Sequence, residues 1–335
     1  MTPATISRAT VRVPASSSNL GAGFDCVGVA IDRWLRVSAE IRDDGRADVH
    51  IRRKGTLRAL DLTGPSDVRD DLIYTGFKAV LNGCSGNDGF TGSVHFDADS
   101  DIPIARGLGS SAAALLAGAA LANATLGLLL SVDELAQICS SIEGHGDNVG
   151  AAALGGAVLV APSSQGAYFA PLPVHDSLAF AFAIPEFETR TELARAALPR
   201  EVPFTTAVSA AARSASLVQG LQTADGRLLA AGLDDVLHVP HRKPFVRDYD
   251  RVIQSAHSAG AFGATLSGSG SAIVAIAPRA IAATVATAMA ESWCAAGVTA
   301  RGFATGVCHA GLSVVSPPHN FSASHSPTPR SVVCQ

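Results

Sequence analysis

The chain has 335 residues, a formal charge of −4 and an apolar share of 47%, which excludes disorder over most of its length and indicates two domains of ordinary size. Charged residues are 16% and aromatic residues 5%, so the composition does not indicate a surface for nucleic acid or an anionic membrane. Six scattered cysteines without a C-x-x-C pair, and an N-terminus without an apolar signal-like core, predict a reduced cytoplasmic protein without disulfides or zinc.

The first seventy residues predict strands joined by polar connections. A strand is expected over 9–14, where apolar and polar residues alternate up to a proline, and a loop over the small and polar residues 15–25. The apolar, β-branched stretch 27–41 predicts one long strand or two. The charged stretch 42–70 predicts a hairpin or a surface excursion.

The middle of the chain predicts two consecutive helices. Residues 110–128 are rich in Ala and Leu and favour a long helix. They lie in a run between Arg106 and Asp133 that has no charged residue and is long enough to cross a bilayer, but its Gly, Asn and Thr residues argue against a membrane span. Ser131 followed by Glu134 forms a capping box, which predicts a second helix ending near residue 141.

Strands and helices mix without strict βαβ alternation, which favours the α+β class. The Pro- and Ser-containing stretch 162–173 predicts a domain connection, so we expect domains over 1–165 and 166–311. Residues 312–335 are rich in Ser, Pro and His and predict a disordered tail. The remaining expected elements are strands over 91–97, 154–161, 178–184, 262–266 and 272–277, a turn over 101–107, and helices over 71–83, 206–220, 227–237, 246–259 and 280–297.

The segment PIARGLGSSAA at 103–113 is the sharpest local feature. Two glycines before a helix let the backbone approach an anion, and the helix start presents free N–H groups and a positive dipole end. Ser110 and Ser111 add hydroxyls that suit phosphate or Mg²⁺. The segment is not a P-loop, and its loose G-x-G-x-x-A spacing lacks the strand that precedes a dinucleotide site. An ordinary capped helix after a turn is the alternative interpretation.

The segment EGHGDN at 143–148 gathers two carboxylates, an imidazole and an amide in a chain with little charge. Glu143 has the oxygen ligands that Mg²⁺ prefers, and Asp147 could orient or deprotonate a hydroxyl. The alternative is a polar helix end followed by a turn. His145 is interpreted as a turn or packing histidine rather than a ligand.

Three further features could bind a small ligand. They are the polar stretch 16–25, the glycine-rich LSGSGS at 266–271, and Thr191 with the two arginines Arg195 and Arg242. Arginine binds carboxylates through two parallel hydrogen bonds, and these two lie in otherwise charge-poor sequence. An ordinary polar loop, a tight turn and a solvated surface are the respective alternatives.

The order of these segments, VPASSSNLGAGFD, PIARGLGSSAAAL, EGHGDNVGAAALGG and LSGSGS, resembles that of the GHMP kinases. The match is strongest with their homoserine kinase branch, which adds the patterns T-x-x-AR-x-x-LP and H-x-P-x-R, found here at 191–199 and 238–242. The resemblance covers about residues 9 to 310. It implies a two-domain fold, with an N-terminal domain like ribosomal protein S5 and a ferredoxin-like C-terminal domain, and a homodimer.

The resemblance also implies an activity, ATP-dependent phosphorylation of the side-chain hydroxyl of L-homoserine. The alternatives are a kinase for another hydroxy amino acid or small alcohol, and a homologue that binds metabolites without catalysis. The implied nucleotide site is Pro103, Ile104, Ala105, Arg106, Gly107, Leu108, Gly109, Ser110 and Ser111, with Ser111 and Glu143 at the Mg²⁺. The implied substrate contacts are Asn19, Asp25, Asp147, Asn148, Thr191, Arg195, Arg242 and Gly268, of which Asp147 and Asn148 are the catalytic pair.

The chain departs from the family pattern at two positions. Gly146 stands where the middle motif usually has proline, and Ser16 stands where relatives such as mevalonate kinase have a lysine that assists an aspartate base. With serine there, Asp147 is expected to lack a cationic partner. We therefore expect Asp147 mainly to position the amino acid and only secondarily to accept the hydroxyl proton.

Overall fold

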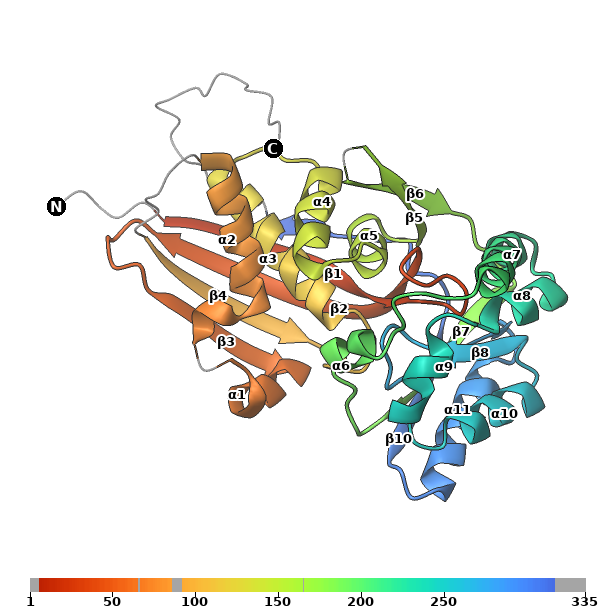
Figure 1. Ribbon diagram of the computed structural model, residues 1–335. Coiled ribbons are helices and arrows are strands. Elements are labelled where there is room, and N and C mark those ends of the chain that lie inside the picture. The colour runs from red at the N-terminus through yellow and green to blue at the C-terminus, as the bar shows by residue number, and fades with distance from the viewer. Residues whose placement is uncertain (1–5, 66, 86–91, 165, 317–335) are drawn as a thin grey trace.

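The computed structural model describes residues 6–65, 67–85, 92–164 and 166–316, which form two β-sheets with helices packed on them (Figure 1). The first sheet lies at the left of Figure 1 beneath its helices, and the second lies at the lower right. The first sheet contains β1 (Ile6–Ser18), β2 (Val27–Arg42), β3 (Val49–Gly55), β4 (Ser93–Ser100), β5 (Ala157–Ser163), β6 (Gly166–Leu172) and β11 (Ser313–Ser316).

The strand order of the first sheet is β11-β1-β2-β4-β3, and β5 and β6 extend it from the end of β2. Neighbouring strands are antiparallel except β3 and β4, which are parallel. Successive side chains on a strand point to opposite faces. Val11, Val13 and Val37 are therefore fully buried, whereas the adjacent Arg12 and Arg36 face solvent.

Helices cover one face of this sheet (Figure 1): α2 (Leu72–Ser85), α3 (Ser110–Leu126), α4 (Val132–Glu143) and α5 (Asp147–Leu154). The short α1 (Leu60–Thr63) lies near the end of β3 and buries none of its residues. The predicted capping box is confirmed at the start of α4, where the Ser131 and Glu134 side chains each accept the other's backbone N–H. Small residues bring α2 and α3 together, since a Cβ at Gly118 would lie 1.8 Å from the Ile73 carbonyl oxygen. The core of this domain is thus built around the Ala-rich α3.

The second sheet contains β7 (Leu178–Pro185), β8 (Gly263–Leu266), β9 (Ile273–Pro278) and β10 (Ala300–Thr305). Its antiparallel order is β10-β7-β9-β8, so the strands, numbered along the chain, stand in the order 4-1-3-2 of a ferredoxin-like domain, as expected. The helices of this half are α6 (Thr191–Ala196), α7 (Phe204–Thr223), α8 (Gly226–Leu233), α9 (Val239–Arg242), α10 (Tyr249–Ser258) and α11 (Ala282–Ala295).

One predicted connection is wrong, and one of the two alternatives for another is excluded, because their residues pair in the first sheet. Residues 162–173 are not a domain connection: β6 pairs with β5 along its whole length. A boundary at residue 165 would divide this hairpin, so we propose that the first domain extends to Leu172. Residues 42–70 do not form a hairpin, since β3 within them pairs in parallel with β4.

Two expectations of irregular structure are also wrong in part. The stretch 16–18, assigned to a loop, completes β1, where Ser16, Ser17 and Ser18 pair with Ala30, Val29 and Gly28. Serine has little intrinsic preference for strands, and here tertiary contacts override that preference. The expected tail at 312–335 includes β11, which pairs with β1; the part from 317 onward lies outside the described residues.

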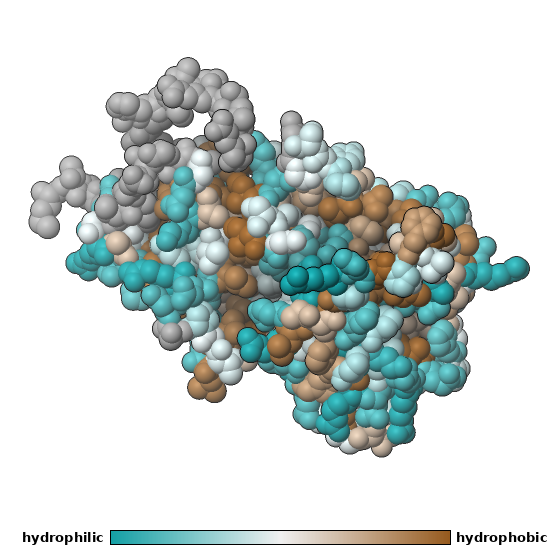
Figure 2. Space-filling model, viewed as in Figure 1, coloured by the Kyte–Doolittle hydropathy of each residue, from teal (hydrophilic) through white to brown (hydrophobic). Residues whose placement is uncertain are grey.

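Hydrophobic and hydrophilic residues are interspersed over both halves of the face shown in Figure 2. Among the residues that the structure describes, no helix has both the length and the hydropathy needed to cross a bilayer.

Candidate active site

A pocket lies where the two domains meet, between the segment 103–111, the turn joining α4 to α5, and helices α6 and α9. Most of the predicted site residues line it, although they come from widely separated parts of the chain. Those that line it are Asn19, Ala105, Gly107, Leu108, Gly109, Ser110, Ser111, Glu143, Asn148, Thr191, Arg195, Arg242 and Gly268, together with His145 and Ser269, which were not predicted. Pro103, Ile104, Arg106, Asp25 and Asp147 are not among the lining residues.

The segment 103–111 is a loop held in a conformation that requires glycine. Gly107 and Gly109 have φ values of 72° and 66°, which L side chains rarely adopt. A Cβ at Gly107 would lie 1.9 Å from the Ser267 carbonyl oxygen, and one at Gly109 would lie 2.2 Å from Ser16 Oγ. No side chain caps the start of α3, so its first N–H groups and dipole remain available to an anion in the pocket.

Arg106 differs from its neighbours in this loop. Its guanidinium donates to the carbonyl oxygens of Pro185 and Ile104 at 3.0 Å and pairs with Glu188 at 2.9 Å. These contacts tie the glycine-rich loop to the end of β7 in the second domain. The side chain is therefore occupied by protein groups, and the loop's anion-binding capacity resides in its backbone.

Ser111 and Glu143 meet at the edge of this loop, where the serine hydroxyl donates to the glutamate carboxylate. Ser111 lies in the first turn of α3 and Glu143 ends α4, so the packing of two helices brings the pair together. The hydroxyl oxygen of Ser111 and the carboxylate oxygens of Glu143 lie next to the glycine-rich loop. Oxygen atoms of this kind are the ligands that Mg²⁺ prefers. The residues present therefore fit a magnesium ion bound together with a nucleotide.

The turn between α4 and α5 holds a buried carboxylate, Asp147, whose side chain has no exposed surface. Its Oδ1 accepts from the Asn148 backbone N–H and lies 2.7 Å from His145 Nδ1, while its buried Oδ2 has no partner in the described part of the chain. Burial alone would lower the pKa of His145, but its hydrogen bond to Asp147 and the nearby carboxylates outweigh burial, and the pKa is raised.

His145 is a partner of Asp147 that the sequence expectation did not identify, and it is a cation whenever its imidazole is protonated. Sequence reasoning missed His145 because it lies only two residues from Asp147. The two side chains meet where the chain turns from the end of α4 at Glu143 to the start of α5 at Asp147. Ser16 is hydrogen-bonded to Asn148, the neighbour of Asp147. Its hydroxyl donates to Asn148 Oδ1 at 2.9 Å, and the Asn148 amide donates to Ser18 at 2.8 Å.

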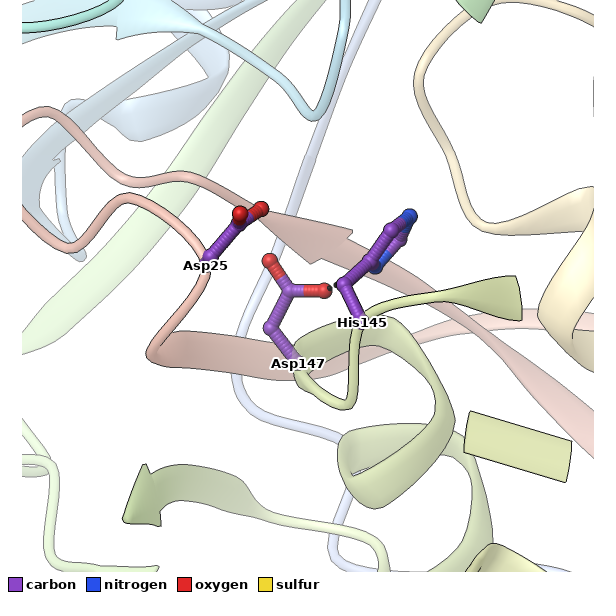
Figure 3. A group of neighbouring side chains, drawn as sticks. All are labelled: Asp25, His145 and Asp147. Carbon is purple, nitrogen blue, oxygen red and sulfur yellow. Dashed lines mark hydrogen bonds and ion pairs between the residues drawn. The ribbon is translucent and has the colours of Figure 1, made fainter. Parts of the chain in front are cut away.

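Asp25, His145 and Asp147 lie close together beside the pocket (Figure 3), with one ligand atom from each within 4.8 Å of the others. Asp25 also forms two parallel bonds with Arg195, at 3.0 and 3.1 Å. This hydrogen-bonded pairing with Asp25 raises the pKa of Arg195. Arg195 already offsets the negative charge of Asp25. The space beside Asp25 and Asp147 therefore suits an ammonium group, which brings one positive charge and three donors.

Arg242 is almost completely buried, with 1% of its surface exposed. Loss of solvation and the neighbouring Arg195 lower its pKa to about 10, so it remains positively charged near neutral pH. Its Nε donates to the Ala194 carbonyl oxygen at 3.2 Å and its Nη1 faces the Gly268 carbonyl oxygen at 3.4 Å. A fixed, desolvated guanidinium at the pocket wall is a strong site for a carboxylate.

The remaining predicted contacts complete the wall beside Arg242. Thr191 Oγ1 lies 3.2 Å from Ser269 Oγ, and the Gly268 N–H donates to the Ser18 carbonyl oxygen at 2.8 Å. Asn19 has a positive φ of 55° and accepts the Asp25 backbone N–H at 2.8 Å. Asn19 therefore shapes the turn that presents Asp25.

Comparison with known proteins places this pocket in a family. The model for the GHMP kinases N terminal domain matches residues 71–156, and that for GHMP kinases C terminal matches residues 217–295. The homoserine kinase of Microchaete diplosiphon is 36% identical over 295 residues, covering 88% of this chain and 93% of its own length. That of Synechococcus sp. is 35% identical over 308 residues, covering 92% and 98%.

Solved structures agree with these relatives. The homoserine kinase from Cytophaga hutchinsonii superimposes with a TM-score of 0.81 at 28% identity, covering 92% of this chain and 97% of its own. The L. major mevalonate kinase, solved with R-mevalonate, shares the fold with a TM-score of 0.61 at 16% identity. The two-domain architecture inferred from the motifs is thus confirmed. The chain belongs to the GHMP kinase family and is most like its homoserine kinases.

Proposed function

We propose that this chain transfers the terminal phosphoryl group of ATP to the side-chain hydroxyl of L-homoserine, giving O-phospho-L-homoserine for threonine biosynthesis. One observation carries the proposal: a single pocket is lined by two sets of groups, one suited to phosphate and one suited to an amino acid. The first is the glycine-rich loop with Ser111 and Glu143. The second is Arg242 together with Arg195, which is paired with Asp25 beside the pocket. The homoserine kinases aligned over most of the chain support this choice of substrate.

We assign the triphosphate to the loop Pro103–Ser111, where the backbone of Gly107 and Gly109 can approach phosphate oxygens closely. Ser111 and Glu143 would hold Mg²⁺. When bound there, the ion would neutralise phosphate charge. The Arg106 side chain keeps the loop in place through its contacts with β7.

We assign the amino acid to the opposite end of the pocket. Asp25 and Asn19 would hold its ammonium group, and Arg195 and Arg242 its carboxylate. Thr191 and Gly268 form the wall around that carboxylate. Asp147 and Asn148 would then face the side-chain hydroxyl.

In the transfer itself, the hydroxyl oxygen attacks the terminal phosphorus, the bond from that phosphorus to the bridging oxygen breaks, and ADP leaves. Positioning and charge neutralisation supply most of the catalysis in such reactions. The free Oδ2 of Asp147 is a buried acceptor without a partner among the described residues. We propose that it positions the amino acid and accepts the hydroxyl proton only secondarily.

The decisive experiment measures ADP release with a panel of hydroxy compounds: homoserine, threonine, serine and aminopropanol, which is homoserine without its carboxylate. Homoserine is expected to give the highest kcat/KM. Preference for threonine or serine would identify a kinase for another hydroxy amino acid. Nucleotide binding without ADP release on any compound would identify an inactive homologue.

We also propose a cytoplasmic homodimer, as the resemblance to the homoserine kinase branch implies. Analytical ultracentrifugation measures the oligomeric state, and a single species of about 34 kDa, the mass of one chain, would contradict the homodimer. Cell fractionation tests the cytoplasmic location.

A further inference from the structure

His238 lies in the H-x-P-x-R segment, yet the proposed function gives it no role. Its side chain has no exposed surface. Nε2 lies 3.1 Å from the Gly21 carbonyl oxygen, and Nδ1 lies 3.4 Å from Arg242 Nη1. A carbonyl only accepts and a guanidinium only donates, so Nε2 carries the hydrogen and Nδ1 presents its lone pair. The imidazole therefore acts as a neutral bridge between Gly21 and Arg242.

The charge state agrees with this geometry. Burial lowers the pKa of His238 to about 4 and outweighs the Asp235 carboxylate, which acts in the opposite direction; the positive charge of Arg242 adds a smaller lowering. Asp235 acts mainly on the backbone: its Oδ2 accepts the N–H groups of Leu237, His238 and Val239 at 2.7–3.0 Å. The start of α9 is thereby fixed, and the imidazole with it.

Phe24 holds the bridge from the side. Its ring stacks on His238 with centroids 5.0 Å apart and planes at 21°, and the Arg242 guanidinium lies 5.0 Å from the same ring. Arg242 thus has Nε on a carbonyl, Nη1 toward His238 and Gly268, and its flat face on an aromatic ring. No hydrogen bond is found for Nη2 within the described ranges, although Arg242 lines the pocket. That nitrogen is left for the substrate.

Gly21 belongs to the same loop as Asn19 and Asp25. The loop is anchored to the second domain by the Ala22 N–H, which donates to the Gly232 carbonyl oxygen at 2.8 Å. The His238 bridge therefore connects the part of the pocket that presents Asp25 with the part that presents Arg242. A substrate with its ammonium and carboxylate on one carbon must find both groups at a fixed separation.

We propose that His238 is a positioning residue that holds Arg242 at a set distance from the Asp25 loop, and so makes the pocket selective for α-amino acids. This inference rests on the proposed function, because it concerns how the same pocket recognises its substrate. His238 does not touch the reacting atoms. It fixes the orientation of the Arg242 guanidinium, so that Nη2 stays available to the substrate carboxylate.

The test compares two replacements of His238 that keep different halves of the bridge. In His238→Asn the side-chain oxygen can accept from Arg242 where Nδ1 does, whereas in His238→Gln the amide reaches toward Gly21 without an acceptor at the Nδ1 position. We expect His238→Gln to raise the homoserine KM about tenfold, since a hydrogen bond to a charged group is weakened. His238→Asn should recover most of this loss. kcat and the KM for ATP should stay near the wild-type values in both.

Aminopropanol is the control substrate, because it has no carboxylate for Arg242. Its kcat/KM should not change in His238→Gln, so the preference for homoserine over aminopropanol should fall about tenfold. Equal losses on both substrates, or an unchanged homoserine KM, would overturn the proposal. If His238→Gln does not fold, Phe24→Leu, which removes the stacking, must lower the same preference.

Calorimetric titration with homoserine separates this inference from the proposed function. A wild-type chain that binds homoserine but releases no ADP would refute the kinase proposal, and weaker binding by His238→Gln would still support the positioning role. A wild-type chain that does not bind homoserine would overturn both.

Discussion

Two histidines flank the pocket in opposite electrostatic surroundings: His145 in the turn between α4 and α5, and His238 at the start of α9. Both side chains are largely buried, with exposures of 10% and 0%. His145 bonds to the Asp147 carboxylate and its pKa is raised, whereas His238 lies between a carbonyl and a guanidinium and its pKa is lowered. Burial lowers the pKa of both imidazoles, and only at His145 do the hydrogen bond to Asp147 and the nearby carboxylates outweigh it.

The two regions also serve different parts of the proposed substrate. In the proposed function, the turn at 143–148 would face the phosphate and the hydroxyl, whereas the segment 235–242 would face the carboxylate. Substitutions of the arginines should therefore change the preference for homoserine over aminopropanol, whereas substitution of Glu143 in the turn should change the dependence on Mg²⁺. The following predictions test this difference between the two regions.

The largest effect is expected for Asp147→Asn, in the turn. Its buried Oδ2 would be replaced by an amide, so the pocket would lose the acceptor for a substrate donor. Positioning is worth several kcal/mol, so kcat/KM for homoserine should fall by up to about 10³-fold, mainly through KM. The acidic limb of the kcat–pH profile should remain. The exposed Asp133→Asn on α4 is the matched control.

A different outcome would reassign Asp147. If Asp147→Asn bound homoserine with the wild-type KM, lost kcat and also lost the acidic limb, Asp147 would be the general base. The turn would then perform proton transfer rather than positioning.

The next effect is expected in the other region, for Arg242→Ala. Losing a charge-assisted hydrogen bond costs about 1.5–3 kcal/mol, so kcat/KM for homoserine should fall about 10- to 100-fold. Arg195→Ala should cost less, because Arg195 is 41% exposed and pairs with Asp25 in the free protein. Activity on aminopropanol should be retained by both variants, and the KM for ATP should change little. Equal loss on aminopropanol would mean that the arginine acts through folding or nucleotide binding.

A smaller and conditional effect is expected for Glu143→Ala. The change removes the carboxylate beside Ser111, so the Mg²⁺ concentration needed for half-maximal activity should rise, and excess Mg²⁺ should partly restore turnover. The exposed Glu192→Ala on α6 should keep the wild-type dependence. An unchanged Mg²⁺ requirement in Glu143→Ala would show that another carboxylate holds the ion.

The smallest effect concerns stability against pH. The pKa of His238 is about 4 in the folded chain against an ordinary value of 6.5. As pH falls from about 6.5 to about 4, the unfolded chain gains this proton and the folded chain does not, so stability is lost over that window. The melting temperature of His238→Gln should therefore change less with pH over this range than that of the wild type. The exposed His257→Gln should show the wild-type slope; a wild-type slope in His238→Gln would place a charged imidazole at α9.

Local chemistry made parts of this molecule predictable from sequence. The Ala-rich α3, the capping box before α4 and the glycine loop depend on neighbouring residues, and all three were expected at nearly their observed positions. The clustering of Asn19, Arg195 and Arg242 around one pocket was foreseen only through the family resemblance, since nothing local relates residues so far apart.

Other features depend on contacts that sequence patterns do not record. The strand character of Ser16–Ser18 arises from pairing with β2 and from the contacts of Ser16 and Ser18 with Asn148. His145 stood in the motif from the start, but only the bend between two helices turns it toward Asp147. The short β11 pairs with β1 from the other end of the chain, which composition could not indicate.

The bidentate pair between Asp25 and Arg195 has a consequence for how ligand affinity responds to ionic strength. A zwitterion can exchange with this pair, placing its carboxylate on Arg195 and its ammonium on Asp25, without adding net charge to the pocket. Screening by salt then acts on both the broken and the newly formed ion pairs. Homoserine affinity should accordingly vary little between dilute and concentrated salt, whereas γ-hydroxybutyrate, an anion without the ammonium, should bind more weakly as salt rises.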